Sequence, residues 1–174
     1  MRFFLAATLL AASVSALAPG ILEERKTDGQ AIAELAHKQI GIPYVYGGGN
    51  CKGPTTGISP GGPVGFDCSG LNLYTACKVL GSKDELPHHA QTQYTDYKEY
   101  SGIRVDYKDA KPGDFYHYTT NSNGNCGSGV EHTNIKYSTG HVINAPKPNY
   151  NVLEEAFWTH SGGLTICSYA IRFW

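Results

Sequence analysis

The chain has 174 residues, of which 41% are hydrophobic and 17% are charged, a balance that indicates a globular domain and excludes an extended disordered chain. Lys and Arg total 14 against 15 Asp and Glu, for a net charge of −1. Nucleic acid is not expected as the main partner, because the sequence has no cluster of Lys and Arg to neutralise phosphates. The 21 Gly and 9 Pro residues predict many loops.

The N-terminus has the pattern of an export signal. Met1-Arg2 supplies a short basic start, residues 3–16 are apolar or small, and Val14-Ser15-Ala16 fits the small-x-small rule for cleavage. A buried N-terminal helix is the less favoured alternative. The apolar run is shorter than the ~20 residues that span a bilayer. We therefore expect a signal peptide at residues 1–16, a leader or removable pro-segment at 17–29, and a secreted protein that leaves the membrane after cleavage.

The sequence holds five cysteines, and secretion favours disulfides. An odd number leaves at least one thiol unpaired or bonded to another molecule, and four cysteines pair in three ways once the odd one is chosen. Neither a Cys-x-x-Cys pair nor a His-x3–5-His pair occurs, so we expect no structural zinc site, and we predict no cofactor. The five are Cys51, Cys68, Cys77, Cys126 and Cys167.

Two helices are expected in the first half of the chain. Asp28 is placed to cap a helix that runs to about Ile40, where Gly41 stops it. Asp67 is placed to cap a second helix over Cys68–Leu80, whose apolar residues share one face. A long loop rich in Gly and Pro joins the two helices.

The second half of the chain has the pattern of short strands. Residues 82–111 are expected to form a loop with one helical turn at Ala90–Tyr94. From Pro112-Gly113-Asp114 onward, β-rich runs alternate with turns. Helices first and strands second indicate an α+β fold, with helices packed on an antiparallel sheet. The expected strands lie within 115–118, 132–137, 141–144, 153–158 and 164–174.

Cys68 has the context of a reactive thiol. If Asp67 caps the helix, Cys68 lies in its first turn, where free N–H groups and the helix dipole favour negative charge. Such a position is expected to lower the pKa of the thiol and to make the nucleophilic thiolate available, and Gly70 is expected to keep the sulfur accessible. An ordinary buried or bridged cysteine is the alternative. A nucleophilic cysteine also needs a base and an orienting group, usually from distant parts of the sequence.

Several short motifs follow one another in a fixed order. Pro-Tyr-x-x-Gly-Gly occupies residues 43–48, and Phe-Asp-Cys-Ser-Gly-Leu occupies residues 66–71. A Leu-Pro pair followed by two glutamines lies at 86–93, and a Pro-Gly-Asp turn lies at 112–114. The order of these motifs is more specific than any one of them.

The last motif is a histidine that opens a strand and a polar residue farther along. His132 begins the run His-Thr-Asn-Ile, and Asn144 lies 12 residues later within Ile-Asn-Ala-Pro. All five motifs together resemble those of the NlpC/P60 family of papain-like cysteine peptidases, which cut bacterial cell-wall peptides. The resemblance covers residues 30–173 and implies a papain-like α+β fold for a catalytic domain at 30–174.

The resemblance implies a Cys-His-Asn triad. Cys68 would be the nucleophile, His132 the base that takes its proton and later protonates the leaving amine, and Asn144 the group that orients the imidazole ring. His141 is a rival for the third position. Because Asn144 carries no charge, it would orient the ring without stabilising an imidazolium as a carboxylate does.

Other positions match residues that line the family's substrate site. These are Tyr44, Asp67 and Ser69, although Asp67 also fits a helix cap alone and Tyr44 a packed ring. The backbone N–H of Cys68 and the Tyr44 hydroxyl are implied donors to an oxyanion. One departure from the family pattern is Asn134, where a small residue is usual.

The resemblance also implies that Cys68 stays free while the other four cysteines form two bridges. We expect Cys51 to pair with Cys77 and Cys126 to pair with Cys167, and a bridge that closes a long loop contributes about 2–4 kcal/mol.

The implied function is that of a secreted, monomeric peptidase with peptidoglycan or a muropeptide as substrate. It would hydrolyse the stem peptide between γ-D-glutamate and the diamino acid through an acyl-enzyme. Two alternatives stay open. One is an N-acetylmuramoyl-L-alanine amidase on the same scaffold, and the other is a non-catalytic secreted binding protein or effector.

Overall fold

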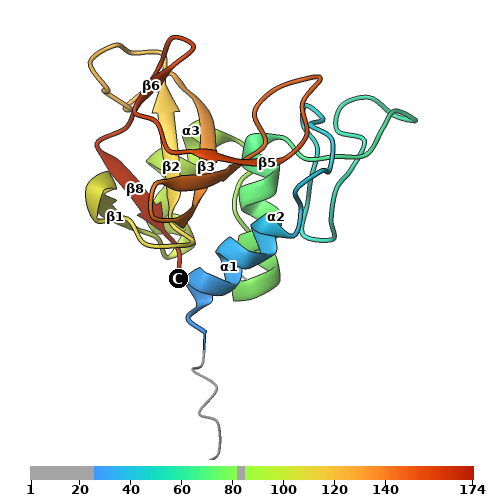
Figure 1. Ribbon diagram of the computed structural model, residues 1–174, viewed down its shortest axis with the longest axis horizontal. Coiled ribbons are helices and arrows are strands. Elements are labelled where there is room, and N and C mark those ends of the chain that lie inside the picture. Colours follow the sequence, from blue (N-terminus) through green and yellow to red (C-terminus); the bar gives the residue numbers. More distant parts are fainter. Residues whose placement is uncertain (1–25, 82–84) are drawn as a thin grey trace, which may run out of the picture.

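The computed structural model describes residues 26–81 and 85–174 (Figure 1). The expected signal peptide, residues 17–25 of the expected leader and residues 82–84 lie outside the described residues. Within the described part of the chain, none of the helices has the length and apolar character needed to cross a bilayer.

Helices come first along the chain and strands second, and the strands form one antiparallel sheet, which confirms the α+β class. The helices are α1 (Asp28–His37), α2 (Cys68–Leu80) and α3 (Ala90–Thr95), with 3-10 turns η2 (Tyr97–Tyr100) and η3 (Tyr107–Asp109). The strands are β1 (Ile103–Asp106), β2 (Phe115–Thr119), β3 (Val130–Ser138), β4 (His141–Asn144), β5 (Leu153–Ala156), β6 (His160–Ser161), β7 (Leu164–Ile166) and β8 (Tyr169–Arg172).

The strand order is β1-β8-β2-β3-β4-β5, and the β6–β7 hairpin adds to the end of β2. In the register of β3 and β4, Ile135 lies opposite Ile143. Side chains alternate between the faces of a strand, so this register places Asn144 on the same face as His132. Glu155 of β5 lies opposite Val142, which puts its side chain on that face too.

The alternation also gives the sheet a core on each face. Phe115, Ile135 and Ile143 pack against the helices, and α1 and α2 lie side by side there (Figure 1). The other face carries Tyr116, Tyr118 and Val142, which pack with aromatic residues that follow β5. The second core lies on the face that holds His132 and Asn144, and Tyr118 lies opposite His132 in the register of β2 and β3.

The first helix differs from its prediction at both ends. Thr27, and not Asp28, is the cap: its side chain accepts from the Gln30 N–H at 3.2 Å, and the Gln30 side chain accepts from the Thr27 N–H at 2.8 Å. Asp28 lies in the first turn, where its negative charge interacts favourably with the positive end of the helix dipole. The helix ends at His37 instead of about Ile40, because the N–H groups of Gln39 and Ile40 bond to carbonyls three residues back instead of four.

Strand β1 lies where the sequence predicted a loop. Three of its four side chains are exposed, so the segment lacks the alternation that marks a strand, and only pairing with β8 makes it one. The last predicted strand, 164–174, is two strands, β7 and β8, separated at Cys167 and Ser168. The short strand β6 was not predicted.

Both expected disulfides are present, and Cys68 is free. The bridge between Cys51 and Cys77 ties the long loop to α2. The bridge between Cys126 and Cys167 ties the loop after β2 to the residue that follows β7.

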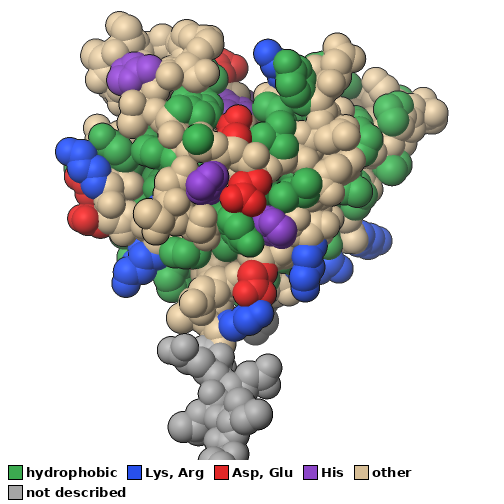
Figure 2. All heavy atoms as spheres, viewed as in Figure 1, with side chains coloured by type: hydrophobic (Ala, Val, Ile, Leu, Met, Phe, Trp, Pro, Cys, Tyr) green, Lys and Arg blue, Asp and Glu red, His purple; other side chains and the backbone are tan. Residues whose placement is uncertain are grey.

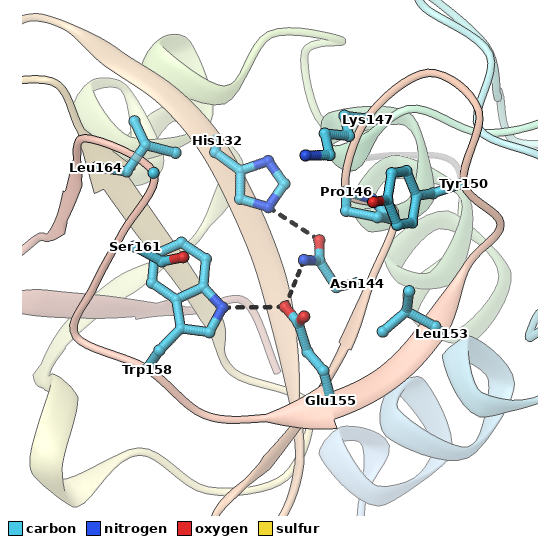
Figure 3. Close-up of a pocket in the computed structure, with 11 residues that line it drawn as sticks. His132, Asn144, Pro146, Lys147, Tyr150, Leu153, Glu155, Trp158, Ser161 and Leu164 are labelled. Carbon is cyan, nitrogen blue, oxygen red and sulfur yellow. Dashed lines mark hydrogen bonds between the residues drawn. The ribbon is translucent and has the colours of Figure 1, made fainter.

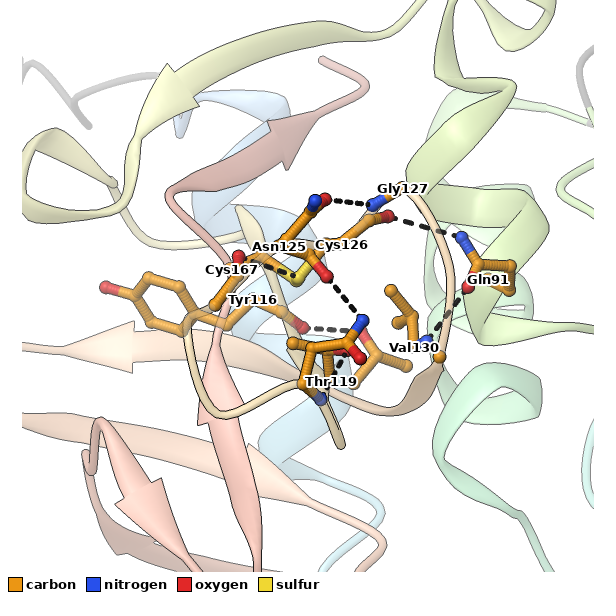
Figure 4. The surroundings of a disulfide bond; sticks show 12 residues. Gln91, Tyr116, Thr119, Asn125, Cys126, Gly127, Val130 and Cys167 are labelled. Atoms are coloured by element: carbon orange, nitrogen blue, oxygen red, sulfur yellow. Dashed lines mark hydrogen bonds between the residues drawn. A yellow bond between two sulfur atoms is a disulfide. The ribbon is translucent and has the colours of Figure 1, made fainter.

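The second bridge lies next to a clamp from α3 (Figure 4). The Gln91 side chain donates to the Cys126 carbonyl at 3.3 Å and accepts from the Val130 N–H at 2.9 Å. Val130 is the first residue of β3, so the bridge and the clamp together fix the start of the strand that carries His132.

A buried ion pair closes the base of the sheet. Asp114, from the Pro-Gly-Asp turn, is fully buried and accepts from Arg172 Nε at 2.8 Å and Nη2 at 2.7 Å. Its Oδ2 also accepts from the Lys111 N–H at 2.7 Å. The turn before β2 is thereby joined to the end of β8.

We expect Asp114→Ala to lower the free energy of unfolding by about 3–5 kcal/mol, because it leaves the Arg172 charge without its partner. Denaturant unfolding followed by fluorescence measures the change. Asp109→Ala is the control: Asp109 is exposed five residues earlier, and its removal should cost less than about 0.5 kcal/mol. Equal losses in the two variants would contradict this account.

Candidate active site

Asp67 places Cys68 at the first position of α2, as the sequence predicted. The Asp67 Oδ1 accepts from the Gly70 N–H at 2.7 Å and so caps the helix. Cys68 is half-buried, and Asn72 Nδ2 of the same helix donates at 2.8 Å to Oγ1 of Thr133, the residue after His132 in β3. The start of α2 therefore meets β3 at the position of the histidine.

Gly70 has a role other than the predicted one of keeping the sulfur accessible. A Cβ at this position would overlap the Gly48 carbonyl oxygen and approach His88 Nε2. Glycine therefore lets the first turn of α2 pack directly against the backbone of the long loop.

The environment of the thiol corrects the expectation of a lowered pKa. Burial, and then the charge of Asp67, raise the pKa of Cys68 to about 12, although the N–H groups of Thr133, Ser69 and Cys68 itself act in the opposite direction. The helix N-terminus favours a thiolate, but the cost of removing a thiolate from water is larger here. The thiol is protonated at neutral pH and needs a base.

His132 and Asn144 form the hydrogen bond that such a base requires. His132 Nε2 donates to Asn144 Oδ1 at 2.9 Å, and both side chains are buried. An amide oxygen only accepts, so Nε2 carries the proton and Nδ1 keeps its lone pair. Burial lowers the pKa of His132 to about 4, against the raising effects of Asn144, Glu155 and Asp67, so the ring is neutral at neutral pH.

The amide of Asn144 is itself held from behind (Figure 3). Its Nδ2 donates to Glu155 Oε1 at 2.6 Å, and Trp158 Nε1 donates to the same oxygen at 3.0 Å. Neither Glu155 nor Trp158 was predicted as a site residue from the sequence. No local signal marks Glu155, because it meets Asn144 only through the pairing of β4 with β5.

Asp67 makes contacts beyond its helix cap. Its Oδ2 accepts from the Gly47 N–H at 2.8 Å, and its Oδ1 accepts from Ser69 Oγ at 3.1 Å and contacts His88 Nε2 at 2.9 Å. Burial alone would raise the pKa of Asp67, but His88 and the N–H groups of Gly70 and Gly47 hold it below its usual value. Asp67 is therefore ionised. His88, which follows the Leu-Pro motif, was not predicted as a site residue from the sequence.

Tyr44 lines the same pocket as Cys68 and Asp67. It pairs with Phe66 through an isolated β-bridge, and its ring is half-buried. Burial, and then the charges of Cys68 and Asp67, raise the pKa of the Tyr44 hydroxyl well above 10. The hydroxyl stays protonated at neutral pH and is a hydrogen-bond donor.

Two hollows lie at this site, one lined by Cys68 and the other by His132. The thiol-side pocket includes Tyr44, Tyr46, Gly47, Ile58, Asp67, Cys68, Ser69, His88 and Glu131, so the long loop forms one of its walls. The imidazole-side pocket includes His132, Asn144, Pro146, Lys147, Tyr150, Glu155, Trp158, Ser161 and Leu164.

The imidazole-side pocket opens to the surface. Its wall residues come from the β6–β7 hairpin and from the loop that follows β4. Figure 2 shows a notch between these two raised segments, with acidic atoms at its floor. In Figure 3 the Lys147 ammonium points toward the His132 ring from one rim of the pocket. A substrate can therefore approach the imidazole from this side.

The remaining histidine and asparagine candidates lie elsewhere. His141, the rival third member, is exposed, and its Nδ1 lies 3.2 Å from the Thr139 carbonyl. His117 is fully buried in β2, as a packed histidine. Asn134, where the family has a small residue, is buried and donates to the Tyr118 hydroxyl at 3.1 Å. Across residues 26–81 and 85–174, no His, Cys, Asp and Glu side chains are grouped to hold a metal.

A family model agrees with the motifs and the fold. The model of the NlpC/P60 family matches residues 41–162, which is more than half of the chain. The chain belongs to the NlpC/P60 family. The α+β fold expected from the resemblance is confirmed, because solved NlpC/P60 domains share the fold.

Peptidoglycan endopeptidase RipA of Mycobacterium tuberculosis is one similar member. It is 40% identical over 109 residues, which are 62% of this chain and 20% of RipA. A solved structure of RipA has a TM-score of 0.67 at 31% identity and covers 84% of this chain and 62% of that one. Solved RipA variants are mutated at a cysteine, a histidine and a glutamate 12 residues after that histidine. Asn144 has this same spacing from His132 here.

Of two further similar proteins, one is named as an enzyme and the other is described as non-catalytic. The γ-DL-glutamyl hydrolase of Bacillus subtilis is 31% identical over 130 residues, which are 73% of this chain and 26% of that enzyme. RipD of M. tuberculosis has a TM-score of 0.64 at 24% identity, covers 85% of this chain and 98% of that one, and is described as non-catalytic and peptidoglycan-binding. The present NlpC/P60 chain spans about a fifth of RipA and a quarter of the hydrolase.

We expect His132→Ala to slow the alkylation of Cys68 by iodoacetamide at about pH 7 by at least about tenfold, because a thiol whose pKa is near 12 then lacks its base. In the unmodified protein, the rate should fall as the pH drops through about 4, where His132 takes up a proton. An ordinary histidine would give this loss near 6.5. Intact-mass measurement of alkylation against pH checks both. A His132→Ala variant that reacts at the original rate would contradict the assignment.

Proposed function

We propose that this protein is a secreted cysteine peptidase that hydrolyses peptidoglycan stem peptides between γ-D-glutamate and the diamino acid. The observation that carries the proposal is the hydrogen bond from His132 Nε2 to Asn144 Oδ1, together with a free thiol at the start of α2. This bond leaves the Nδ1 lone pair as the proton acceptor. Nucleophile, base and orienting group thus come from three separate segments in the arrangement of a Cys-His-Asn triad.

The chemistry is acyl transfer in two stages. His132 Nδ1 takes the proton of the Cys68 thiol as the sulfur bonds to the peptide carbonyl carbon, and the carbonyl oxygen becomes an oxyanion. The Cys68 N–H and the Tyr44 hydroxyl are the proposed oxyanion donors. The carbon–nitrogen bond then breaks, and His132 gives its proton to the leaving amine. Water repeats the sequence on the thioester, which releases the carboxylic acid and restores the thiol.

The two pockets receive opposite sides of the scissile bond in this proposal. The imidazole protonates the leaving amine, so the leaving part of the substrate lies in the imidazole-side pocket, beyond His132. The acyl part lies in the thiol-side pocket, over the start of α2. Exposed Lys147 suits the carboxylates of a leaving diamino peptide.

The relatives and the disulfides support the substrate class and the location. RipA is named as a peptidoglycan endopeptidase, and the B. subtilis relative is named as a γ-DL-glutamyl hydrolase. Two disulfides suit a protein that works in an oxidising environment outside the cell. We propose that the mature chain begins after residue 16 and acts as a monomer.

We expect the purified protein to cleave soluble muropeptides between γ-D-glutamate and the diamino acid, and Cys68→Ala to lower the rate by at least about ten-thousand-fold, because the nucleophile is lost. Mass spectrometry of the products identifies the bond. Release of an intact stem peptide would instead indicate the amidase alternative. Binding of muropeptides without cleavage by either form, while Cys68 titrates as a free thiol, would indicate the binding protein.

We expect Tyr44→Phe to lower kcat by about 10- to 100-fold with little change in KM, because an oxyanion donor acts in the transition state. Steady-state kinetics on the same muropeptide measures both constants. Tyr74→Phe is the matched control, since Tyr74 lies on α2 and packs against Phe66 outside both pockets. A loss confined to KM would assign Tyr44 to substrate binding alone.

A further inference from the structure

Asn144 is held on the side away from the imidazole by a carboxylate. Its Nδ2 donates to Glu155 Oε1 at 2.6 Å, a bond drawn in Figure 3. We propose that Glu155 is a positioning residue, which keeps the Asn144 oxygen turned toward His132 and supplies the negative charge that Asn144 lacks. This inference rests on the proposed roles of Cys68, His132 and Asn144.

The orientation of the amide decides which imidazole nitrogen carries the proton. An Asn144 turned the other way would present its NH₂ to His132 Nε2, and the proton would then move to Nδ1. That tautomer cannot accept the thiol proton. A carboxylate only accepts hydrogen bonds, so Glu155 holds the NH₂ on its own side. Trp158 donates to the same carboxylate oxygen at 3.0 Å and fixes Glu155 in turn.

The charge of Glu155 acts at the step where His132 becomes an imidazolium. RipA, which has variants mutated at a histidine and at a glutamate 12 residues later, has a carboxylate at the spacing of Asn144. Here the residue at that spacing is neutral, and the carboxylate lies one hydrogen bond farther from the ring. An imidazolium formed at His132 is stabilised through the chain His132–Asn144–Glu155.

Other ionisable groups lie near His132, but within the described residues none of them is hydrogen-bonded to the imidazole ring. Asp67 at the start of α2 is ionised, but its oxygens are held by His88, Ser69 and backbone N–H groups. Of the remaining ionisable groups, Tyr118 of β2 and Lys147 of the loop after β4 lie beside the ring, Cys68 of α2 and Glu131 of β3 line the thiol-side pocket, and His117 of β2 packs against Tyr94 on the opposite face of the sheet.

The first test variant is Glu155→Gln, which keeps an acceptor oxygen for Asn144 and Trp158 but removes the charge. Without the negative charge of Glu155, His132 binds a proton less tightly. The pH at which activity is lost on the acid side (the acid limb) should therefore fall by about 0.5–1 unit. We expect kcat on the muropeptide to fall about three- to tenfold with KM unchanged, because the imidazolium forms after the substrate binds.

The second variant exchanges the amide and the acid. In N144D/E155Q, the new carboxylate at position 144 accepts from His132, while the new amide at position 155 donates to it and accepts from Trp158. One negative charge is restored, one bond nearer the ring. We expect kcat at least about threefold above that of Glu155→Gln and an acid limb at or above its original pH.

Glu154→Gln is the matched control. Glu154 is the neighbouring acid on the same strand, but it is exposed and lies 3.5 Å from His37 Nε2. This variant should keep the original kcat and acid limb. Unfolding temperatures of all the variants are measured alongside, so that a loss of folded protein is not counted as a loss of kcat.

The alkylation of Cys68 by iodoacetamide separates this inference from the proposed function, since it needs no peptide substrate. The acid limb of alkylation should shift down in Glu155→Gln and return in the exchanged variant, even if the protein cleaves no muropeptide. A Glu155→Gln variant whose acid limb matches that of the unmodified protein overturns the inference. An exchanged variant no better than Glu155→Gln also overturns it.

Discussion

The hydrogen bond from His132 Nε2 to Asn144 Oδ1 is the constraint on which the rest of the site depends. It assigns the proton to one nitrogen and leaves the other free to accept. The bond exists because β3 and β4 pair in a register that puts both side chains on one face of the sheet. A slip of one residue in that register would turn Asn144 to the opposite face. The disulfide and the Gln91 clamp hold the start of β3 in place.

Burial gives this site a neutral resting state. It raises the pKa of Cys68 and lowers the pKa of His132, so both the thiol and the imidazole are uncharged at neutral pH. A thiolate and an imidazolium form only when the proton moves from Cys68 to His132. The surrounding dipoles and carboxylates stabilise these charges at that step. Asp67 at the start of α2 and Glu155 behind Asn144 are the two acids that raise the pKa of His132. Preorganised groups of this kind need no rearrangement during the reaction.

Features that depend on neighbours in the chain were predicted correctly from the sequence. It placed the Asp67 cap and the second helix, because a cap is an interaction between residues three apart. It missed strand β1, whose mostly exposed side chains show no alternation. It also gave the wrong direction for the pKa of Cys68, because a local helix position says nothing about how deeply the fold buries the sulfur. The motif resemblance, and not the residue pattern alone, indicated His132, Asn144 and a free Cys68 beside two bridges, while the choice of disulfide partners was a separate hypothesis.

The sequence by itself determined the α+β class, the helix that presents Cys68 and the family to which the chain belongs. These follow from local hydrogen bonding, from the periods of apolar residues and from motifs in a fixed order. Only the tertiary structure decided that Glu155 holds Asn144 and that His88 contacts Asp67. Such contacts depend on strand register and on how the loops close over the helix, and both are set by packing between segments that are distant in the chain.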